Sequence, residues 1–366
     1  MALSLQFEQF ALTKRWQATA LQGAVLSYAA MSNWTDLLET AVHAPSPHNV
    51  QPWRIKILSE TQADLFIDSA RTLPKEDTTG SFIILTMGMF IEALRILAAN
   101  KGFHLKHSIY REPSWYALEI LNTKSQVFLP FARLQLTATA PIQGLTDAAT
   151  FLKRRTSRIS LKPDPIPVED VEALRLLADT WKHRFEVITD KDSIECILKK
   201  NTEAVFEDLN HRDYHDEIVE WFRFTDKKSK ETRDGLDYRC MNTSRSAFWL
   251  SARAPKLLQL PLTSALLANV YRRQLGLVPT LGMLAGQFWA AEHAFETGSF
   301  LMQFWLATAE HNLYIHPFGN LVTNKKAAAW LLNETKVPDI WLIFKIGYSD
   351  EPPKSYRRSV KEILLD

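Results

Sequence analysis

The chain has 366 residues, of which 46% are hydrophobic, so it can bury a large core as one large domain or as two closely packed halves. Its formal net charge of +2 is nearly neutral for this length and gives no indication of non-specific nucleic-acid binding. The two cysteines, Cys196 and Cys240, cannot form a disulfide framework or a thiolate metal site, and they fit a reducing cytoplasm.

The N-terminal region gives no membrane or export signal. Residues 23–31 are apolar but far fewer than the roughly 20 residues that a spanning helix needs. Lys14-Arg15 precede a short apolar run, but there is no sustained hydrophobic region and Glu8 lies upstream, which argues against a signal peptide. We therefore expect a soluble cytoplasmic protein without a membrane or nucleic-acid partner.

The first third of the chain begins with two helical segments. Residues 1–33 are amphipathic and are expected to form a helical arm on the body of the protein or on a second subunit. Residues 35–43 have helical spacing, and Pro45 and Pro47 end that helix because neither donates a backbone N–H. Residues 54–58 and 63–68 then alternate in polarity and predict a pair of strands.

A polar turn between this helix and the first strand is the main functional signal. Ser46, His48, Asn49 and Gln51 place four hydrogen-bonding side chains within a few residues. Such a turn suits a planar ligand with polar edges, but an ordinary helix–strand connection has a similar composition. The run A-P-S-x-x-N-x-Q-P-W resembles the signature of the nitroreductase family of flavin mononucleotide (FMN) enzymes, and in particular its internally duplicated, Acg-like branch. That resemblance implies FMN contacts from Pro45, Ser46, Asn49 and Gln51.

Residues 81–99 are mostly apolar and predict a buried central helix, in which Gly88 permits the close approach of another backbone. The alternation in residues 103–109, 115–121 and 131–137 predicts three strands. The order D-x-x-R-x-L-P-x-x-D, which starts at Asp68, also resembles the Acg-like branch.

A basic segment follows at the start of the second half. We expect a helix that begins at Asp147 and carries the residues up to Arg158. Family enzymes commonly open with R-x-S-x-R, whose cationic and hydroxyl groups hold the flavin. The matching positions are Arg154, Thr156 and Arg158, with threonine in place of serine, and guanidinium groups suit a phosphate because they bind it bidentately.

The next region is predicted to contain a helix over 168–181, a strand over 185–189 and helices over 193–210 and 214–224. The pattern W-x-R followed by D-G, at Trp221 and Asp234, resembles the Acg-like branch again. Residues 217–279 look like an insertion relative to ordinary family members. They form either a lid over the flavin or a peripheral helical insertion.

The last part predicts an apolar helix over 295–313 and a buried strand over 339–347. His316 and Pro317, which follow that helix, are further candidate cofactor contacts. The tail resembles the closing "strand, G-Y, P, basic pair" arrangement of the family. Lys354 and Arg357 are the tail's candidate phosphate ligands, and Arg358 is an alternative that the sequence cannot separate from them.

An internal repeat supports a duplicated chain, because Gly88-Met89-Phe90-Ile91 is matched 210 residues later by Gly298-Ser299-Phe300-Leu301. The expected fold is α+β and nitroreductase-like, a fused pseudo-dimer in which a central mixed or antiparallel sheet is flanked by helices. The expected domains are the arm (1–33), a first half (34–146) and a second half (147–366) with the probable lid. Since the turn lies in one half and the basic segment in the other, we expect one complete site and one FMN per chain.

The resemblance implies an FMN oxidoreductase that takes hydride from NADH or NADPH and reduces a small nitro- or quinone-like molecule, with the flavin rather than a side chain carrying the chemistry. A protein that sequesters FMN beneath a closed lid, and a dehydrogenase or tailoring oxidase for one metabolite, remain open alternatives. No metal-site motif surrounds the histidine pairs, and no glycine-rich phosphate loop occurs. The fused chain is expected to be a monomer or a homodimer.

Overall fold

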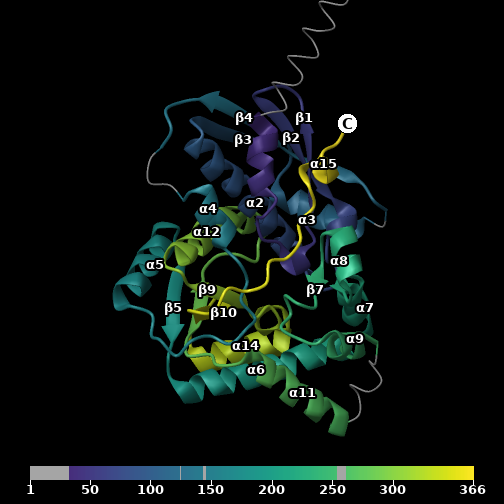
Figure 1. Cartoon of the computed structure of the whole chain (residues 1–366), viewed down its shortest axis with the longest axis vertical. Helices are drawn as coiled ribbons and strands as arrows, with labels where there is room; N and C mark the ends of the chain where they lie inside the picture. Colours follow the sequence, from purple (N-terminus) through teal and green to yellow (C-terminus); the bar gives the residue numbers. More distant parts are fainter. Residues whose placement is uncertain (1–32, 124, 143–145, 254–260) are drawn as a thin grey trace, which may run out of the picture.

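Two four-stranded antiparallel sheets organise the protein, which we describe from a computed structural model of residues 33–123, 125–142, 146–253 and 261–366 (Figure 1). The first sheet has the order β1-β2-β4-β3 and the second the order β5-β8-β10-β9. The expected α+β class is confirmed, with the strands divided between two sheets. The strands are β1 Trp53–Ile57, β2 Gln62–Asp68, β3 Phe103–Ile109, β4 Phe128–Ala138, β5 Arg184–Ile188, β8 Leu281–Ala285, β9 Tyr314–Pro317 and β10 Ile340–Gly347.

The two sheets share one topology. In each, the fourth strand in chain order lies between the second and the third, and every pairing is antiparallel. In each half a long helix joins the second strand to the third, namely α2 (Ser81–Asn100) in the first and α12 (Ala291–Glu310) in the second. The four strands and the long helix thus follow the same order in both, although the second also has further helices and short strands between β5 and β8.

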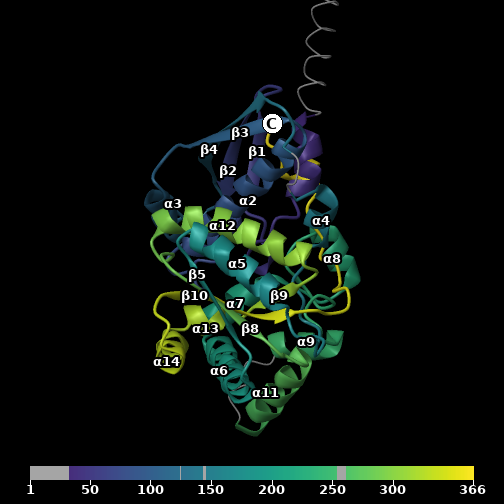
Figure 2. The same ribbon diagram turned by 90° about the vertical axis from the view of Figure 1, so that its left-hand side faces the viewer.

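Helices α2 and α12 pack against each other between the sheets (Figure 2). Their contact requires two glycines, because a Cβ added to Gly88 would lie 2.1 Å from the Phe295 carbonyl oxygen. A Cβ on Gly298 would lie 2.1 Å from the Leu85 carbonyl oxygen. Gly88 therefore permits the close backbone approach that the sequence predicts. Helix α2 is long and apolar enough to cross a membrane, but 89% of its apolar window is buried inside the protein.

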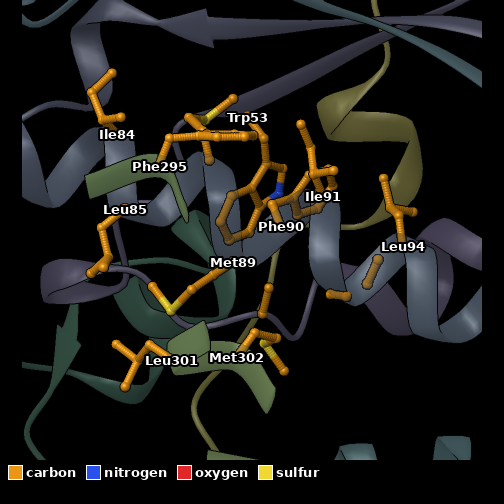
Figure 3. Packing of buried hydrophobic residues seen from close by; sticks show 14 of the residues in the cluster. Trp53, Ile84, Leu85, Met89, Phe90, Ile91, Leu94, Phe295, Leu301 and Met302 are labelled. Carbon is orange, nitrogen blue, oxygen red and sulfur yellow. The ribbon is translucent and has the colours of Figure 1, made fainter. Parts of the chain in front are cut away.

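The main hydrophobic core surrounds this helix pair and joins both halves (Figure 3). In the first half the Trp53 ring stacks on Phe90, with 4.6 Å between ring centroids. In the second half His183, just before β5, stacks on Phe300 with the same 4.6 Å separation. Phe300 is the residue 210 positions after Phe90, so the sequence repeat and the packing coincide.

A second, smaller core lies under the second sheet, between that sheet and the helices of the second half. The region expected as an insertion crosses from this half along one side of the molecule to the first half (Figure 1). Its residues 254–260 lie outside the described part, as do residues 1–32, which hold nearly all of the expected arm. The remaining elements are α3 Pro113–Asn122, α4 Ala148–Lys153, α5 Val168–Thr180, α6 Lys191–Asn210, α7 Arg212–Glu220, β6 Phe222–Arg223, α8 Asp226–Thr232, β7 Leu236–Asp237, α9 Arg245–Arg253, α11 Pro261–Leu275, α13 Asn320–Thr323, α14 Lys325–Thr335 and α15 Val360–Ile363.

Two sequence-based predictions of local structure are wrong. Residues 115–121, expected as a strand, belong to helix α3, because Pro113 starts the helix and the buried residues Pro113, Tyr116, Ala117 and Ile120 recur with helical spacing. The helix predicted to extend through the basic segment ends at Lys153. Residues beyond it are extended, and Thr156 forms a backbone bridge with Ile315 of β9.

The C-terminal tail leaves the second sheet after β10 and returns to the first (yellow in Figure 1). The Leu365 amide donates to the Ile55 carbonyl at 2.7 Å, and Leu364 bridges the same strand. The tail therefore brings its basic residues from one half of the molecule to the other.

Candidate functional site

The turn before β1 has an unusual backbone that its side chains stabilise. His48, Asn49 and Gln51 all have positive φ angles, of 46°, 57° and 52°. Non-glycine residues adopt this region only when their surroundings hold them there. Ser46 contributes, since its Oγ accepts a hydrogen bond from the Gln51 amide at 3.0 Å. Pro45 precedes the turn and is buried.

Gln51 connects the turn to two distant segments. Its Nε2 donates to the Arg233 carbonyl at 2.9 Å, and its Oε1 accepts from the Arg358 amide at 2.9 Å. The side chain is fully buried. The expectation that Gln51 contacts a cofactor stays a prediction, because these protein partners already engage its amide.

Asn49 is tied down in a similar way but leaves one atom free. Its Nδ2 donates to the Tyr356 carbonyl at 3.1 Å and to the Gly235 carbonyl at 3.3 Å. Its Oδ1 is buried and has no hydrogen-bond partner among the described residues. A buried acceptor without a donor is costly, so this oxygen is suited to an N–H or O–H group of a ligand.

Arg154 lies directly after α4 and reaches the residues before the turn. Its Nη2 donates to the His43 carbonyl at 3.0 Å, and the guanidinium lies 4.7 Å from the centre of the Trp305 ring. Its Nε has no partner. Burial, followed by the nearby charge of Arg357, lowers the pKa of Arg154 to about 9.

Arg357 approaches from the tail, and its charge is equally uncompensated. It donates to the Ser355 hydroxyl and to the Tyr356 carbonyl, while its Nε lacks a partner. Burial lowers the pKa of Arg357 to about 10. Burial and then the charges of Arg357, Lys354, Arg154 and Arg155 lower the pKa of His43 to about 3.

A second cationic group stands on the second sheet. Arg158 donates to the Cys240 carbonyl at 3.2 Å, and burial lowers its pKa. Lys345 donates to the Ile159 and Leu275 carbonyls, and burial followed by Arg158 lowers its pKa to about 7. Burial and the same two cations depress the pKa of His316 well below its usual value. Pro317 is the last residue of β9, and Thr156 forms a backbone bridge with Ile315 of the same strand.

Among the described residues, no carboxylate oxygen lies within 4.0 Å of Arg154, Arg158 or Arg357. Buried cations are normally paired, because taking a charge out of water is expensive. Arg155, next to Arg154, is paired, at 2.6 Å from Glu351. The set of unpaired guanidinium groups is therefore complementary to an anion, and phosphate has the charge and oxygen geometry to bind them.

A pocket of about 600 Å³ opens beside Arg357, the one of these three arginines that lines it. The predicted residues Lys354 and Arg357, and the alternative Arg358, lie in its wall. Its other lining residues are Glu39, Val42, His43, Arg233, Arg239, Ser355, Tyr356, Ser359, Val360 and Lys361.

No family model matches the chain. Three proteins of Mycobacterium tuberculosis are similar in sequence. "Putative NAD(P)H nitroreductase acg" is 31% identical over 51% of this chain and 54% of its own, and "Uncharacterized protein Rv3127" is 29% identical over 50% of each. "Putative NAD(P)H nitroreductase Rv3131" is 25% identical over 50% of this chain and 49% of its own. Over about half of its length, the chain is therefore similar in sequence to curated proteins named as nitroreductases. The matched region spans about half the length of these curated relatives.

Solved nitroreductase structures resemble this chain more weakly. The FMN-dependent nitroreductase NfnB from Mycobacterium smegmatis, in complex with NADPH, has 16% identity and a TM-score of 0.38, and covers 59% of this chain and 96% of its own. A nitroreductase with bound FMN from Bacteroides fragilis has 15% identity and a TM-score of 0.32, with coverages of 57% and 91%.

The two motifs that resemble the Acg-like branch meet in space. Arg71 donates to Asp234 at 2.8 Å and to the Val50 carbonyl at 2.9 Å, and Arg223 donates to the same carboxylate at 2.6 Å. Arg71 and Arg223 also lie beside the Trp221 ring. The motifs thus form one buried ionic network that fixes the inserted segment against the turn.

Gly235, next to Asp234, extends this link along the backbone. Its amide donates to the Asn49 carbonyl at 3.2 Å. It has a φ of 75°, and a Cβ there would lie 2.3 Å from the Trp221 carbonyl oxygen. Only glycine fits this position without displacing the main chain.

Sequence reasoning missed several site residues. Arg239, Lys345 and His43 carry no motif, and only the folded chain brings them to the site. His48 was noted only as one of the four polar side chains of the turn, because it occupies a variable position of the motif. In the structure it forms an ion pair with Glu76.

Proposed function

We propose that this chain is a nitroreductase-family, FMN-dependent oxidoreductase that accepts electrons from NADH or NADPH and reduces a small nitro- or quinone-like molecule. The observation that carries the proposal is the set of buried arginines without carboxylate partners, one of which, Arg357, lines a pocket of about 600 Å³. The names of two curated relatives, both called nitroreductases that use NAD(P)H, support the same reaction class.

Arg154 and Arg357 would hold the FMN phosphate, because they come from different segments of the chain, both are buried without an acidic neighbour, and the charge of Arg357 helps to lower the pKa of Arg154. Lys354 lies at the pocket wall and would add a third charge. Bidentate guanidinium contacts with a dianion would replace the hydration that these groups lose on burial. Bound FMN supplies the hydride-transfer chemistry of this family.

The polar edge of the flavin would meet the turn and the second cationic group. The unpaired Oδ1 of Asn49 is an acceptor for a ring N–H, and Ser46 holds the turn backbone in place. Arg158 would face the same ligand from the second sheet, with Thr156, His316 and Pro317 in its neighbourhood. These roles follow from the charge of each side chain and from whether each of its atoms donates or accepts hydrogen bonds.

We infer a duplicated chain with one FMN. The common strand order of the two sheets and the paired stacks of Trp53 on Phe90 and His183 on Phe300 support this inference. In the second half, His183 fills the place of the tryptophan, and the preceding segment lacks the serine, asparagine and glutamine of the turn. The halves would then correspond to residues 34–146 and 147–366.

The inserted region around residues 217–279 would act as a lid that is anchored at one end. Gln51 and Asn49 bond to the backbone of residues 233 and 235, which places the start of this region against the turn. The proposal includes a cytoplasmic location and a small-molecule substrate, with the fused chain as a monomer or a homodimer.

The first experiment is the visible spectrum of the purified protein, followed by anaerobic addition of NADPH or NADH. A yellow protein that is bleached by either nucleotide supports the proposal. A yellow protein that only dithionite reduces would contradict nicotinamide-dependent turnover and favour sequestration. A colourless protein that takes up no added FMN would refute the cofactor assignment.

A pair of adjacent arginine variants tests the phosphate assignment. Arg154→Met should weaken FMN binding at least tenfold while leaving the flavin-free protein as stable as wild type or more so, because it removes an uncompensated buried charge. Arg155→Met is the control, since Arg155 has its own partners in Glu351 and the Pro352 carbonyl. Equal loss of FMN affinity in both variants would refute a specific role for Arg154.

A further inference from the structure

His48 and Glu76 form an ion pair at the edge of the candidate site. His48 occupies the middle of the turn between Ser46 and Asn49, and Glu76 lies in the loop before α2. Each side chain is only 17% exposed. The backbone of His48 is left-handed, with a φ of 46°, a conformation that a non-glycine residue adopts only when its surroundings hold it there.

Glu76 is itself fixed in position from the inserted region. The Glu217 carboxylate, on α7, accepts hydrogen bonds from the backbone amides of Lys75 and Glu76, each at 2.9 Å. Glu76, from the loop before α2, and Glu217, from α7, therefore place two carboxylates on the same side of His48. Since Glu217 is the first residue of the region proposed as a lid, that region contributes to the environment of the histidine.

The charges around His48 favour its protonated form. Burial lowers the pKa of His48 and Arg158 opposes protonation too, but Glu76, with help from Glu217, overcomes both and raises the pKa above its usual value. Asp208 and Tyr214 lie near Glu76 as additional titratable groups on α6 and α7. The neighbourhood is thus anionic on the Glu76 side and cationic on the Arg158 side.

His48 Nε2 is engaged by Glu76, while no described residue accepts a hydrogen bond from Nδ1. His48 lies between Ser46 and Asn49, so its ring belongs to the turn that holds the candidate flavin contacts. The pair therefore has the arrangement of a general acid, in which a carboxylate holds one ring nitrogen and the other nitrogen carries a proton that can be donated.

We propose that His48, paired with Glu76 through Nε2, delivers a proton from Nδ1 to the substrate oxygen. This inference rests on the proposed function. For a quinone, the substrate gains two electrons and one hydrogen nucleus as hydride from the reduced flavin, and the proton from His48 completes the hydroquinone. His48 is left as neutral imidazole and regains its proton from water.

The test compares His48→Gln and Glu76→Gln with wild type, with the exposed His104→Gln as a matched control. In each protein three quantities are measured: bound flavin by absorbance, the rate of flavin reduction by NADPH, and the rate of its reoxidation by a water-soluble benzoquinone across pH 5–9. His48→Gln should slow the quinone step about 100-fold, as expected for loss of a general acid, while flavin content and the NADPH step stay within threefold.

Glu76→Gln keeps the imidazole and provides an independent readout. The His48 pKa, followed by NMR of the ring proton, should fall by about one unit or more when the opposite charge is removed. The pH above which the quinone step declines should fall by the same amount, whereas His104→Gln should change neither quantity.

Flavin-loaded His48→Gln with a wild-type quinone rate and pH profile would overturn this proposal and leave the proposed function intact. If His48→Gln loses its flavin, His48 contributes to flavin binding and the result from Glu76→Gln decides. The proton-donor role is then overturned unless Glu76→Gln retains flavin and lowers both the His48 pKa and the pH at which the quinone step declines. Wild-type protein that binds no flavin would refute the proposed function and this inference together.

Discussion

Replacing Gly88 with alanine should destabilise the protein, although the same change in an exposed helix would stabilise it. The new Cβ would lie 2.1 Å from the Phe295 carbonyl oxygen and 3.2 Å from the Gly298 Cα. A backbone oxygen in the middle of α12 cannot rotate away as a side chain can. The two helices must therefore separate by more than about 1 Å to reach an ordinary contact distance.

The expected free-energy change combines two opposing effects. Overpacking of a tight core costs typically 1–3 kcal/mol, and this contact is at the severe end because main chain meets main chain. Alanine recovers about 1 kcal/mol of helix propensity relative to glycine. We expect a net loss of about 2 kcal/mol, together with looser packing along the whole interface of α2 and α12.

Urea unfolding followed by tryptophan fluorescence measures this effect as a lower midpoint at an unchanged slope. Gly319→Ala is the control, because a Cβ there meets nothing within 4 Å and the residue has an ordinary helical φ of −55°. The combined change of Gly88 and Gly298 should cost less than the sum of the single changes, since both separate the same helices. A Gly88→Ala protein as stable as wild type would refute the reasoning.

Three further predictions concern charge. Burial raises the pKa of Asp77 to about 6, so between about pH 4 and 6 the folded state holds a proton that the unfolded state has released. The free energy of unfolding should therefore fall by at most about 3 kcal/mol as the pH rises through this range. Asp77→Asn should abolish this decline, measured as urea midpoints between pH 4.5 and 7. Asp234→Ala should lower the free energy of unfolding by about 3 kcal/mol, because it leaves the Arg71 and Arg223 guanidinium groups without their shared carboxylate. The inserted region should then become sensitive to limited proteolysis, and an unchanged digestion pattern would contradict this prediction. Inorganic phosphate at ten times its dissociation constant should stabilise the flavin-free protein by about 1.4 kcal/mol, and Arg154→Met should remove that gain in a thermal melt.

Sequence patterns predicted two kinds of feature: elements that are buried on all sides, and motifs whose residues all lie within one short stretch of the chain. Helix α2 is apolar on all sides, and that alone indicates a buried central helix. The turn from Pro45 to Gln51 is a continuous motif. Residues 115–121 were misassigned because their apolar residues fit both a strand and a helix, and the decisive residue, Pro113, lies just outside the alternating run.

The rest of the candidate site depends on contacts between distant segments, which no local pattern encodes. Gln51 looked like a ligand contact by its chemistry, yet it bonds to residues 233 and 358. Lys345 lies in a strand whose other side chains are apolar, and the sequence does not show that it is buried near Arg158 in the folded chain. The pairing of Arg71 with Asp234 likewise joins two motifs that are separated by 163 positions.

The return of the C-terminal tail to the first half has a consequence for synthesis of the protein. Asn49 and Tyr356, which bond directly, are 307 residues apart. At a translation rate of roughly 5–20 residues per second, the turn waits about 15 s to one minute on the ribosome before its partner is made. During that time the first sheet lacks the strand-edge contact that Leu365 makes with Ile55. The candidate site is therefore completed only after the residues up to Leu365 have been made, and nascent chains are expected to depend on chaperones until then.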